Sequence, residues 1–171
     1  MSSLRRVAGR GCAVYYFLRT LGKIKGRDFL LRDTSLIRVD KPGSVRLGKG
    51  AHIEKGARIV VTSSLYVGDN VYVGKNSTIV AMAPVTIERG VLIGENVSIH
   101  SEDHGPPGAR SIYSVAPIYI GADSWIAAGV VILKGVTIGS RTTIGANAVV
   151  TKDVPSDALA YGVPAKVVGS R

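Results

Sequence analysis

One stretch of the sequence gathers side chains that could do acid–base chemistry. Residues 97–121, VSIHSEDHGPPGARSIYSVAPIYIG, contain two of the three histidines, His100 and His104, together with Glu102 and Asp103. Imidazole and carboxylate groups are the side chains that most often move protons in enzymes. Taken alone, a histidine in such a polar loop is more often a solvated surface residue than a catalytic base.

The loop interrupts a repeat with a period of six residues. An aliphatic residue recurs at every sixth position before the loop and after it, and two extra residues separate the early registers. This ladder consists of Leu47, Ile53, Ile59, Val67, Val73, Ile79, Ile87, Ile93, Ile99, Ile120, Ile126, Ile132, Ile138, Ile144 and Val150. Glycine often follows the ladder residue, where we expect it to allow a tight turn with positive φ. A small or β-branched residue often lies four positions after the ladder residue.

A period of six fits neither an amphipathic helix nor an alternating strand. It fits a triangular prism, in which three short strands complete one coil of about 18 residues. The ladder residues would point to the prism axis, where each coil covers the apolar core of its neighbours. The sequence therefore predicts an all-β fold, a parallel β-helix of hexapeptide repeats with one inserted loop over residues 101–117.

The repeat and the C-terminal block resemble a known family. The motif [Leu/Ile/Val]-Gly-x-x-[small/Val]-x over residues 47–154 is similar to that of the hexapeptide-repeat acyltransferases. The segments SWI, VTIG, VVTKDVP and GVPAKV occur in the order found in maltose/galactoside and cell-envelope polysaccharide O-acetyltransferases. The resemblance implies a left-handed β-helix, a homotrimer with active sites between subunits, and acetyl-CoA as co-substrate without a metal. It also implies acetyl transfer to a sugar hydroxyl of a bacterial cell-surface polysaccharide or its precursor.

The resemblance assigns the catalytic base to His104. The family base is a histidine in an inserted loop, and an ungapped match over residues 78–105 aligns it with His104, not His100. Such an imidazole would take the proton of the acceptor hydroxyl and later protonate the leaving thiolate, which is worth roughly 10²–10⁴ in rate. The residues expected to bind the acceptor are Glu102, Asp103, Arg110 and Tyr113. Either carboxylate could instead orient the imidazole.

The resemblance also implies a binding site for coenzyme A near the C-terminal end. Backbone contacts are expected at Ala128 and Ala146, and adenine or phosphate contacts at Thr151 and Lys152. Lys166 is a further candidate, because a lysine ammonium suits phosphate as a point charge. The alternative for both lysines is solvated surface charge. Trp125 is expected to pack in the scaffold and brace the wall of this groove.

Two positions depart from the maltose/galactoside type. Gly74 takes the place of an asparagine that shapes the acceptor pocket there, and Met82 takes the place of an aspartate. The resemblance to acetyltransferases is unaffected, but these two differences argue against free maltose or galactosides as acceptors.

The first part of the chain is strongly basic. Residues 1–32 carry a net charge of +7 out of +10. Apolar residues at helical spacing around Val14–Leu21 predict a helix that caps the prism or lies on an anionic membrane surface. We therefore expect a basic, helical segment over residues 1–40, the β-helix over 41–157 and a tail over 158–171. The single cysteine favours a reducing, cytoplasmic location, with contact to the inner face of the membrane through residues 1–32.

Three alternatives to a sugar O-acetyltransferase remain at this point. An amino-sugar N-acetyltransferase would use the same scaffold, donor and base. A zinc hydratase of the γ-carbonic anhydrase type would need three converging histidines. A non-enzymatic scaffold would work mainly through its basic N-terminus. No phosphate-binding loop of the Walker type is present, and no nucleic-acid partner is expected.

Overall fold

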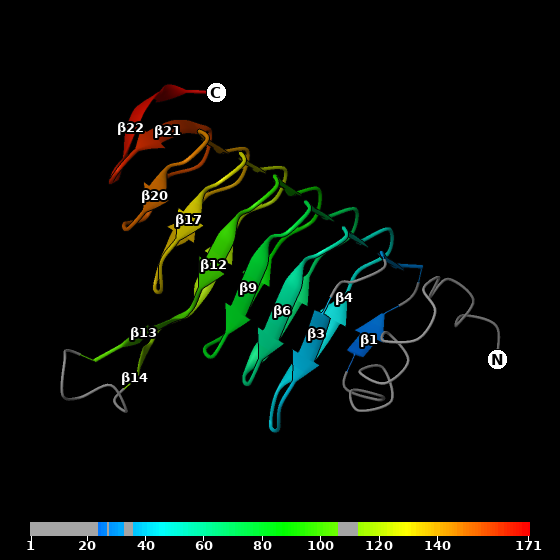
Figure 1. Ribbon diagram of the computed structural model, residues 1–171. Coiled ribbons are helices and arrows are strands. Elements are labelled where there is room, and N and C mark those ends of the chain that lie inside the picture. The colour runs from blue at the N-terminus through cyan, green and yellow to red at the C-terminus, as the bar shows by residue number, and fades with distance from the viewer. Residues whose placement is uncertain (1–23, 27, 33–35, 106–112) are drawn as a thin grey trace.

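The protein is a prism of three parallel β-sheets (Figure 1). The computed structural model describes residues 24–26, 28–32, 36–105 and 113–171. The regular elements of the described residues are all strands, so these residues include no helix long and apolar enough to cross a membrane. The helix expected around Val14–Leu21 lies outside the described residues.

Before residue 101, and again over residues 118–150, the chain visits the three sheets in turn, so that every third strand belongs to the same sheet. Sheet 1 contains β1 (Ile24–Gly26), β4 (Ser44–Leu47), β7 (Ser64–Val67), β10 (Val85–Ile87), β15 (Ile118–Ile120) and β18 (Thr137–Ile138). Sheet 2 contains β2 (Leu30–Leu31), β5 (His52–Ile53), β8 (Tyr72–Val73), β11 (Leu92–Ile93), β16 (Trp125–Ile126), β19 (Thr143–Ile144), β21 (Ala158–Gly162) and β22 (Ala165–Ser170). Sheet 3 contains β3 (Leu36–Val39), β6 (Arg58–Val61), β9 (Thr78–Ala81), β12 (Ser98–His100), β17 (Val131–Ile132) and β20 (Val149–Val150).

The predicted ladder forms the core of the prism. Every ladder residue from Leu47 to Val150 is at most 1 % exposed. In-register partners are 20 residues apart in the early coils, as for Val45 and Leu65, and 18 apart later, as for Tyr119 and Thr137. The two extra residues of the early coils are those that separate the registers in the sequence. The strands are only two to four residues long in most coils, so the core depends on stacking of coils and not on long strands.

The expected reason for the repeated glycines was wrong. Positive φ occurs at the third residue after the ladder position, as at Gly50, Asn70 and Gly90, and not at the glycine directly after it. The glycine directly after the ladder residue is needed because the backbone of the next coil lies too close to leave room for a Cβ. A Cβ on Gly74 would lie 2.4 Å from the Gly94 carbonyl oxygen, and one on Gly121 would lie 2.5 Å from the Ser140 nitrogen. Close approach of stacked corners therefore selects glycine there.

The ends of the prism also differ from expectation. Strands of the coil occur before residue 41, because β1 pairs in parallel with β4 and β3 with β6. At the other end, residues 158–171 form a hairpin of β21 and β22, and β21 extends sheet 2 by pairing with β19. The last coil is therefore covered by a two-stranded unit.

Candidate active site

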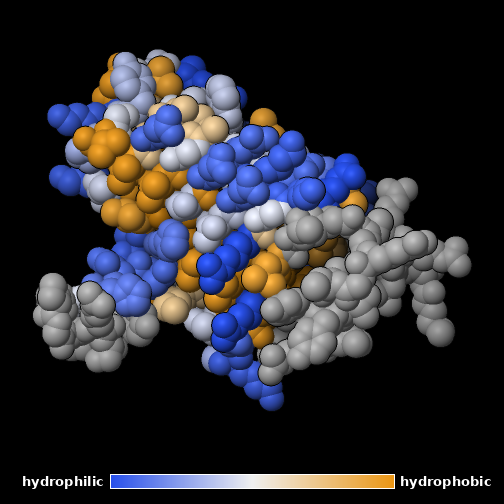
Figure 2. Space-filling model, in the orientation of Figure 1, coloured by the Kyte–Doolittle hydropathy of each residue, from blue (hydrophilic) through white to orange (hydrophobic). Residues whose placement is uncertain are grey.

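The inserted loop forms an arm that projects from one corner of the prism. Its strands β13 (Glu102–His104) and β14 (Tyr113–Val115) pair antiparallel, with His104 opposite Tyr113. The arm lies between β12 of sheet 3 and β15 of sheet 1 in the chain, so it leaves the prism where these two sheets meet. Figure 1 shows it extending sideways from the coils, and Figure 2 shows its described surface as hydrophilic.

Ser101 fastens the root of the arm to the preceding coil. Its side chain is buried, and its hydroxyl oxygen accepts a hydrogen bond from the Ala83 N–H at 2.9 Å. The hydroxyl lies within donating distance of the carbonyl oxygens of Val80, at 3.1 Å, and Ala83, at 3.2 Å. The Ala116 N–H donates to the Ser101 carbonyl at 3.0 Å, which ties the end of the arm to its beginning.

Lys134 fastens the arm to the following coil. Its ammonium donates a hydrogen bond to Asp103 Oδ2 at 3.2 Å. The hydrogen bond and the charge of Lys134 lower the pKa of Asp103, and the backbone N–H of His104 lowers it further. The Asp103 carboxylate therefore connects the corner after β17 with the backbone of the candidate base.

The second carboxylate of the arm pairs with the other histidine. Glu102 Oε1 lies 2.9 Å from His100 Nδ1, and the Glu102 side chain is only 12 % exposed. Its Oε2 is buried and accepts no hydrogen bond from the described residues. His100 lies outward on sheet 3, as expected, and holds the base of the arm through this contact.

His104 itself is exposed on β13. An exposed imidazole beside a fastened backbone can reach a substrate at the surface of the prism without rearrangement of the core. Arg110 and the side chain of Tyr113 lie outside the described part of the chain, so the structure does not test their expected roles.

Four of the five residues expected to bind coenzyme A lie at the two edges of sheet 3. Ala128 and Ala146 are exposed in successive coils at the corner between sheets 2 and 3, where the Asn147 N–H donates to the Ala128 carbonyl at 2.9 Å. Thr151 and Lys152 are exposed directly after β20, at the corner from which the arm projects. Lys166 is exposed on β22 in the C-terminal hairpin.

The register brings Lys152 into line with the arm. Ile99 pairs with Ile132, and Ile132 pairs with Val150, so Ser101, Lys134 and Lys152 occupy equivalent positions in three successive coils. Neighbouring strands lie about 4.8 Å apart. One edge of the prism therefore carries the root of the arm, the lysine that binds Asp103 and the expected phosphate contact.

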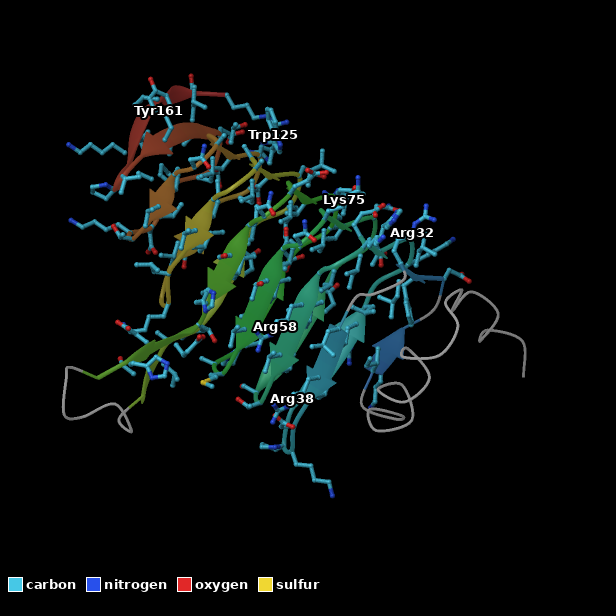
Figure 3. The ribbon with its side chains drawn as sticks, viewed as in Figure 1. Arg32, Arg38, Arg58, Lys75, Trp125 and Tyr161 are labelled. Carbon is cyan, nitrogen blue, oxygen red and sulfur yellow. The ribbon has the colours of Figure 1, made fainter. Side chains whose placement is uncertain are left out.

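The roles of Ser101 and Lys134 were not predicted from the sequence. Lys134 follows the ladder residue Ile132 by two positions, and the register would have placed it beside the loop, but nothing in the sequence indicates its partner. Trp125 was predicted wrongly to pack in the scaffold, because it is 49 % exposed on sheet 2, away from the arm (Figure 3).

The described residues contain no group of three His, Cys, Asp or Glu side chains that could hold a metal ion. His52 lies on sheet 2, where its ring makes an edge contact with Tyr72 at a centroid distance of 5.2 Å. Sheet 2 is the side of the triangle opposite the corner that carries the arm. Within one chain His52 is therefore separated by the prism from His100 and His104.

Comparison with known proteins supports the resemblance. A family model described as bacterial transferase hexapeptide (six repeats) matches residues 117–152, and one described as hexapeptide repeat of succinyl-transferase matches residues 65–101. A comparison with curated proteins gives no match.

Three solved structures share the fold over most of the chain. A hexapeptide-repeat-containing acetyltransferase of Vibrio cholerae, complexed with acetyl coenzyme A, is 30% identical, with 93% of this chain and 76% of that chain covered and a TM-score of 0.62. A maltose O-acetyltransferase of Clostridium difficile is 26% identical, with coverages of 90% and 72% and a TM-score of 0.57. A galactoside acetyltransferase in complex with coenzyme A is 32% identical, with coverages of 86% and 64% and a TM-score of 0.58.

These matches confirm the predicted left-handed parallel β-helix. The similarity to the Vibrio cholerae protein covers 93% of the chain at 30% identity. On the repeat, the fold and this similarity, the chain belongs to the hexapeptide-repeat acyltransferases and is an acyltransferase.

Proposed function

We propose that the protein is an acetyl-CoA-dependent O-acetyltransferase that moves an acetyl group to a sugar hydroxyl of a bacterial cell-surface polysaccharide or its precursor. The observation that carries the proposal is the fastened arm, which presents the exposed His104 on the same edge of the prism as Lys152. Two of the similar structures contain acetyl coenzyme A or coenzyme A, and one similar protein is a maltose O-acetyltransferase.

The described residues fit a coenzyme A donor. Ala128 and Ala146 lie in successive coils with small side chains, so the backbone beside them is accessible to a narrow pantetheine arm. Lys152 and Lys166 are exposed and form no ion pair with the described residues. Both ammonium groups are therefore available to bind the phosphates of coenzyme A. Acetyl-CoA would supply an activated acyl group as a thioester.

The residues of the chain have separate tasks in this proposal. His104 accepts the proton of the acceptor hydroxyl during attack and returns it to the leaving thiolate. Asp103 and Lys134 hold the backbone that carries His104, and Ser101 and the His100–Glu102 pair hold the root of the arm. Arg110 and Tyr113 are proposed to contact the acceptor.

The proposed assembly is a homotrimer with active sites between subunits. Leu92 and Trp125 are register neighbours on sheet 2 and are 51 % and 49 % exposed. Burial of such apolar side chains against another copy would stabilise an assembly. Light scattering of the full chain measures the oligomeric state directly.

The test of the proposal is an acceptor panel with thiol release as the readout. Each neutral sugar is paired with the amino sugar that differs only at one carbon, such as galactose with galactosamine. The proposal predicts turnover with hydroxyl acceptors and O-acetyl products by mass spectrometry. Turnover restricted to the amino member of each pair would replace it with N-acetylation. Absence of acetyl-CoA binding by calorimetry would reject the donor.

A further inference from the structure

A column of outward-facing side chains runs along sheet 1. Strand pairing places these side chains in one register, one per coil. The column consists of Lys25, Arg46, Tyr66, Thr86, Tyr119 and Thr137. From Arg46 onward the neighbours of these residues within each strand, such as Val45 and Leu47, are buried, so these column residues face outward. Lys25 is itself exposed. Successive members are about 4.8 Å apart.

The first coils of this column form an open groove. It has a volume of about 390 Å³, and its polar lining is Lys25, Ser44, Arg46, Ser64 and Tyr66 over a floor of Val45 and Leu65. None of the described residues that line it carries a carboxylate. Two cations, two hydroxyl groups and a phenol therefore share one concave surface.

The two cations of the groove lack the carboxylate partner that three exposed arginines of the chain have. Arg38, Arg89 and Arg141 pair with Asp40, Asp123 and Asp157. Within the described residues, neither Lys25 nor Arg46 forms an ion pair. Cations that face a groove without a carboxylate attract an anionic group.

The column leads from the groove toward the arm. Tyr119 lies on β15, the strand that follows the arm in the chain, and it is 39 % exposed. Burial and the nearby Glu88 raise the pKa of its phenol, so the hydroxyl stays protonated and can donate a hydrogen bond at neutral pH. A tyrosine offers an apolar ring and a polar hydroxyl, which suits a sugar ring with its hydroxyl groups.

We propose that the sheet 1 column is a binding track for an acidic polysaccharide chain. Its anionic groups would bind Lys25 and Arg46, and its sugar rings would lie on Tyr66 and Tyr119. This inference rests on the proposed function, because it names the acceptor as an acidic glycan whose modified sugar lies at the arm. The reaction on the glycan is the acetyl transfer already described.

The probe for the track is hexagalacturonate, with neutral maltohexaose as the matched control of equal length. Binding to the full chain is measured by calorimetry at low and raised ionic strength. We expect hexagalacturonate to bind at least about tenfold more tightly than maltohexaose, and salt to reduce that difference. Arg46→Gln and Lys25→Gln together should weaken hexagalacturonate binding by about tenfold or more, as expected for lost charge-assisted contacts.

Further variants separate charge from ring contacts. Tyr66→Ala should weaken binding of both glycans, while Tyr66→Phe should retain most of it because the ring remains. Arg58→Gln on sheet 3 removes the same charge from another face (Figure 3) and should leave binding unchanged. Thermal unfolding of each variant shows whether the exposed substitution has left the fold intact.

The following results would overturn the track. Hexagalacturonate binding that is equal in the wild type, the Lys25/Arg46 double variant and Tyr66→Ala would place the glycan elsewhere. Binding of phosphatidylglycerol vesicles through Lys25 and Arg46, without hexagalacturonate binding, would assign these residues to a membrane surface instead. Acetyl transfer to small sugars without any glycan binding would reject the track and leave the proposed function intact. Glycan binding through the column without any thiol release would reject the proposed function and retain the track.

Discussion

The Lys134 ammonium lies 3.2 Å from the Asp103 carboxylate and so joins the arm to the following coil. Lys134 follows β17, while Asp103 is the middle residue of β13, next to the candidate base. The contact is exposed, so its contribution to global stability is small. We propose that the contact positions the backbone of the candidate base His104.

Lys134→Met should lower kcat several-fold and leave acetyl-CoA affinity within about twofold, because misplacement of a catalytic group reduces the rate of the chemical step. Asp103→Asn should have a similar effect, and the double variant should be little worse than either single variant. Steady-state kinetics and calorimetry measure both quantities. Lys55→Met, at an exposed corner remote from the arm, is the control. Additive losses in the double variant would contradict a shared role.

The Lys134–Asp103 contact should be insensitive to pH in the neutral range. Lys134 lowers the pKa of Asp103 below its usual value of 3.8, so the folded state favours the carboxylate. The stabilisation of the arm is therefore fully present above the usual pKa and is lost as pH falls through the lowered folded value. The measurement is the hydrogen-exchange rate of the His104 amide in the wild type divided by its rate in Asp103→Asn. This ratio should be constant between about pH 5 and 8. A change in that ratio near neutral pH would assign the effect to another group.

Ser101→Ala should destabilise the protein by about 1–3 kcal/mol, because it leaves the buried Ala83 N–H without its acceptor. Urea unfolding measures the loss. Ser98→Ala is the matched control in the same segment, because Ser98 is half-buried on the outer side of sheet 3. Equal stability of the two variants would show that the Ser101 hydroxyl is not required at the root.

Gly74→Ala should destabilise the prism by about 1–3 kcal/mol through overpacking. The added methyl group would lie 2.4 Å from the Gly94 carbonyl oxygen. This oxygen belongs to the backbone, which cannot move aside as easily as the end of a flexible side chain. Gly169→Ala is the control, because no atom lies within 4 Å of its added Cβ and φ there is not positive. Equal midpoints of thermal unfolding for Gly74→Ala and Gly169→Ala would show that close approach of stacked corners does not require glycine at position 74.

The prism could be predicted because its core is formed by aliphatic residues that recur at a fixed spacing of six in the sequence. Each ladder residue contributes to the same axis, so the period of six identifies both the buried positions and the stacking of coils. The reason for each glycine could not be predicted in this way. The pattern marks Gly74 and Gly121 as special, but the atoms that exclude a Cβ belong to the next coil and become visible only after folding.

The site could be predicted less completely. His104 and the residues after β20 follow from resemblance, whereas the partners of Asp103 and Glu102 depend on how the arm leaves the corner. Strands β1–β3 were missed because residues 24–39 do not continue the ladder, although Ile37 and Val39 are buried. Trp125 was misjudged although the pattern marks it: it directly precedes the ladder residue Ile126, and adjacent side chains of a strand point to opposite faces.

The most direct test of the account is thiol release by His104→Ala, measured with acetyl-CoA and the best acceptor of the panel, alongside acetyl-CoA binding to the same sample. The account predicts a loss of roughly 10²–10⁴ in turnover, because the acceptor hydroxyl loses its base. Acetyl-CoA affinity should stay within about threefold, since a loss of the base alone should affect turnover far more than donor binding. Turnover close to that of the wild type would contradict the assignment of His104 as the catalytic base.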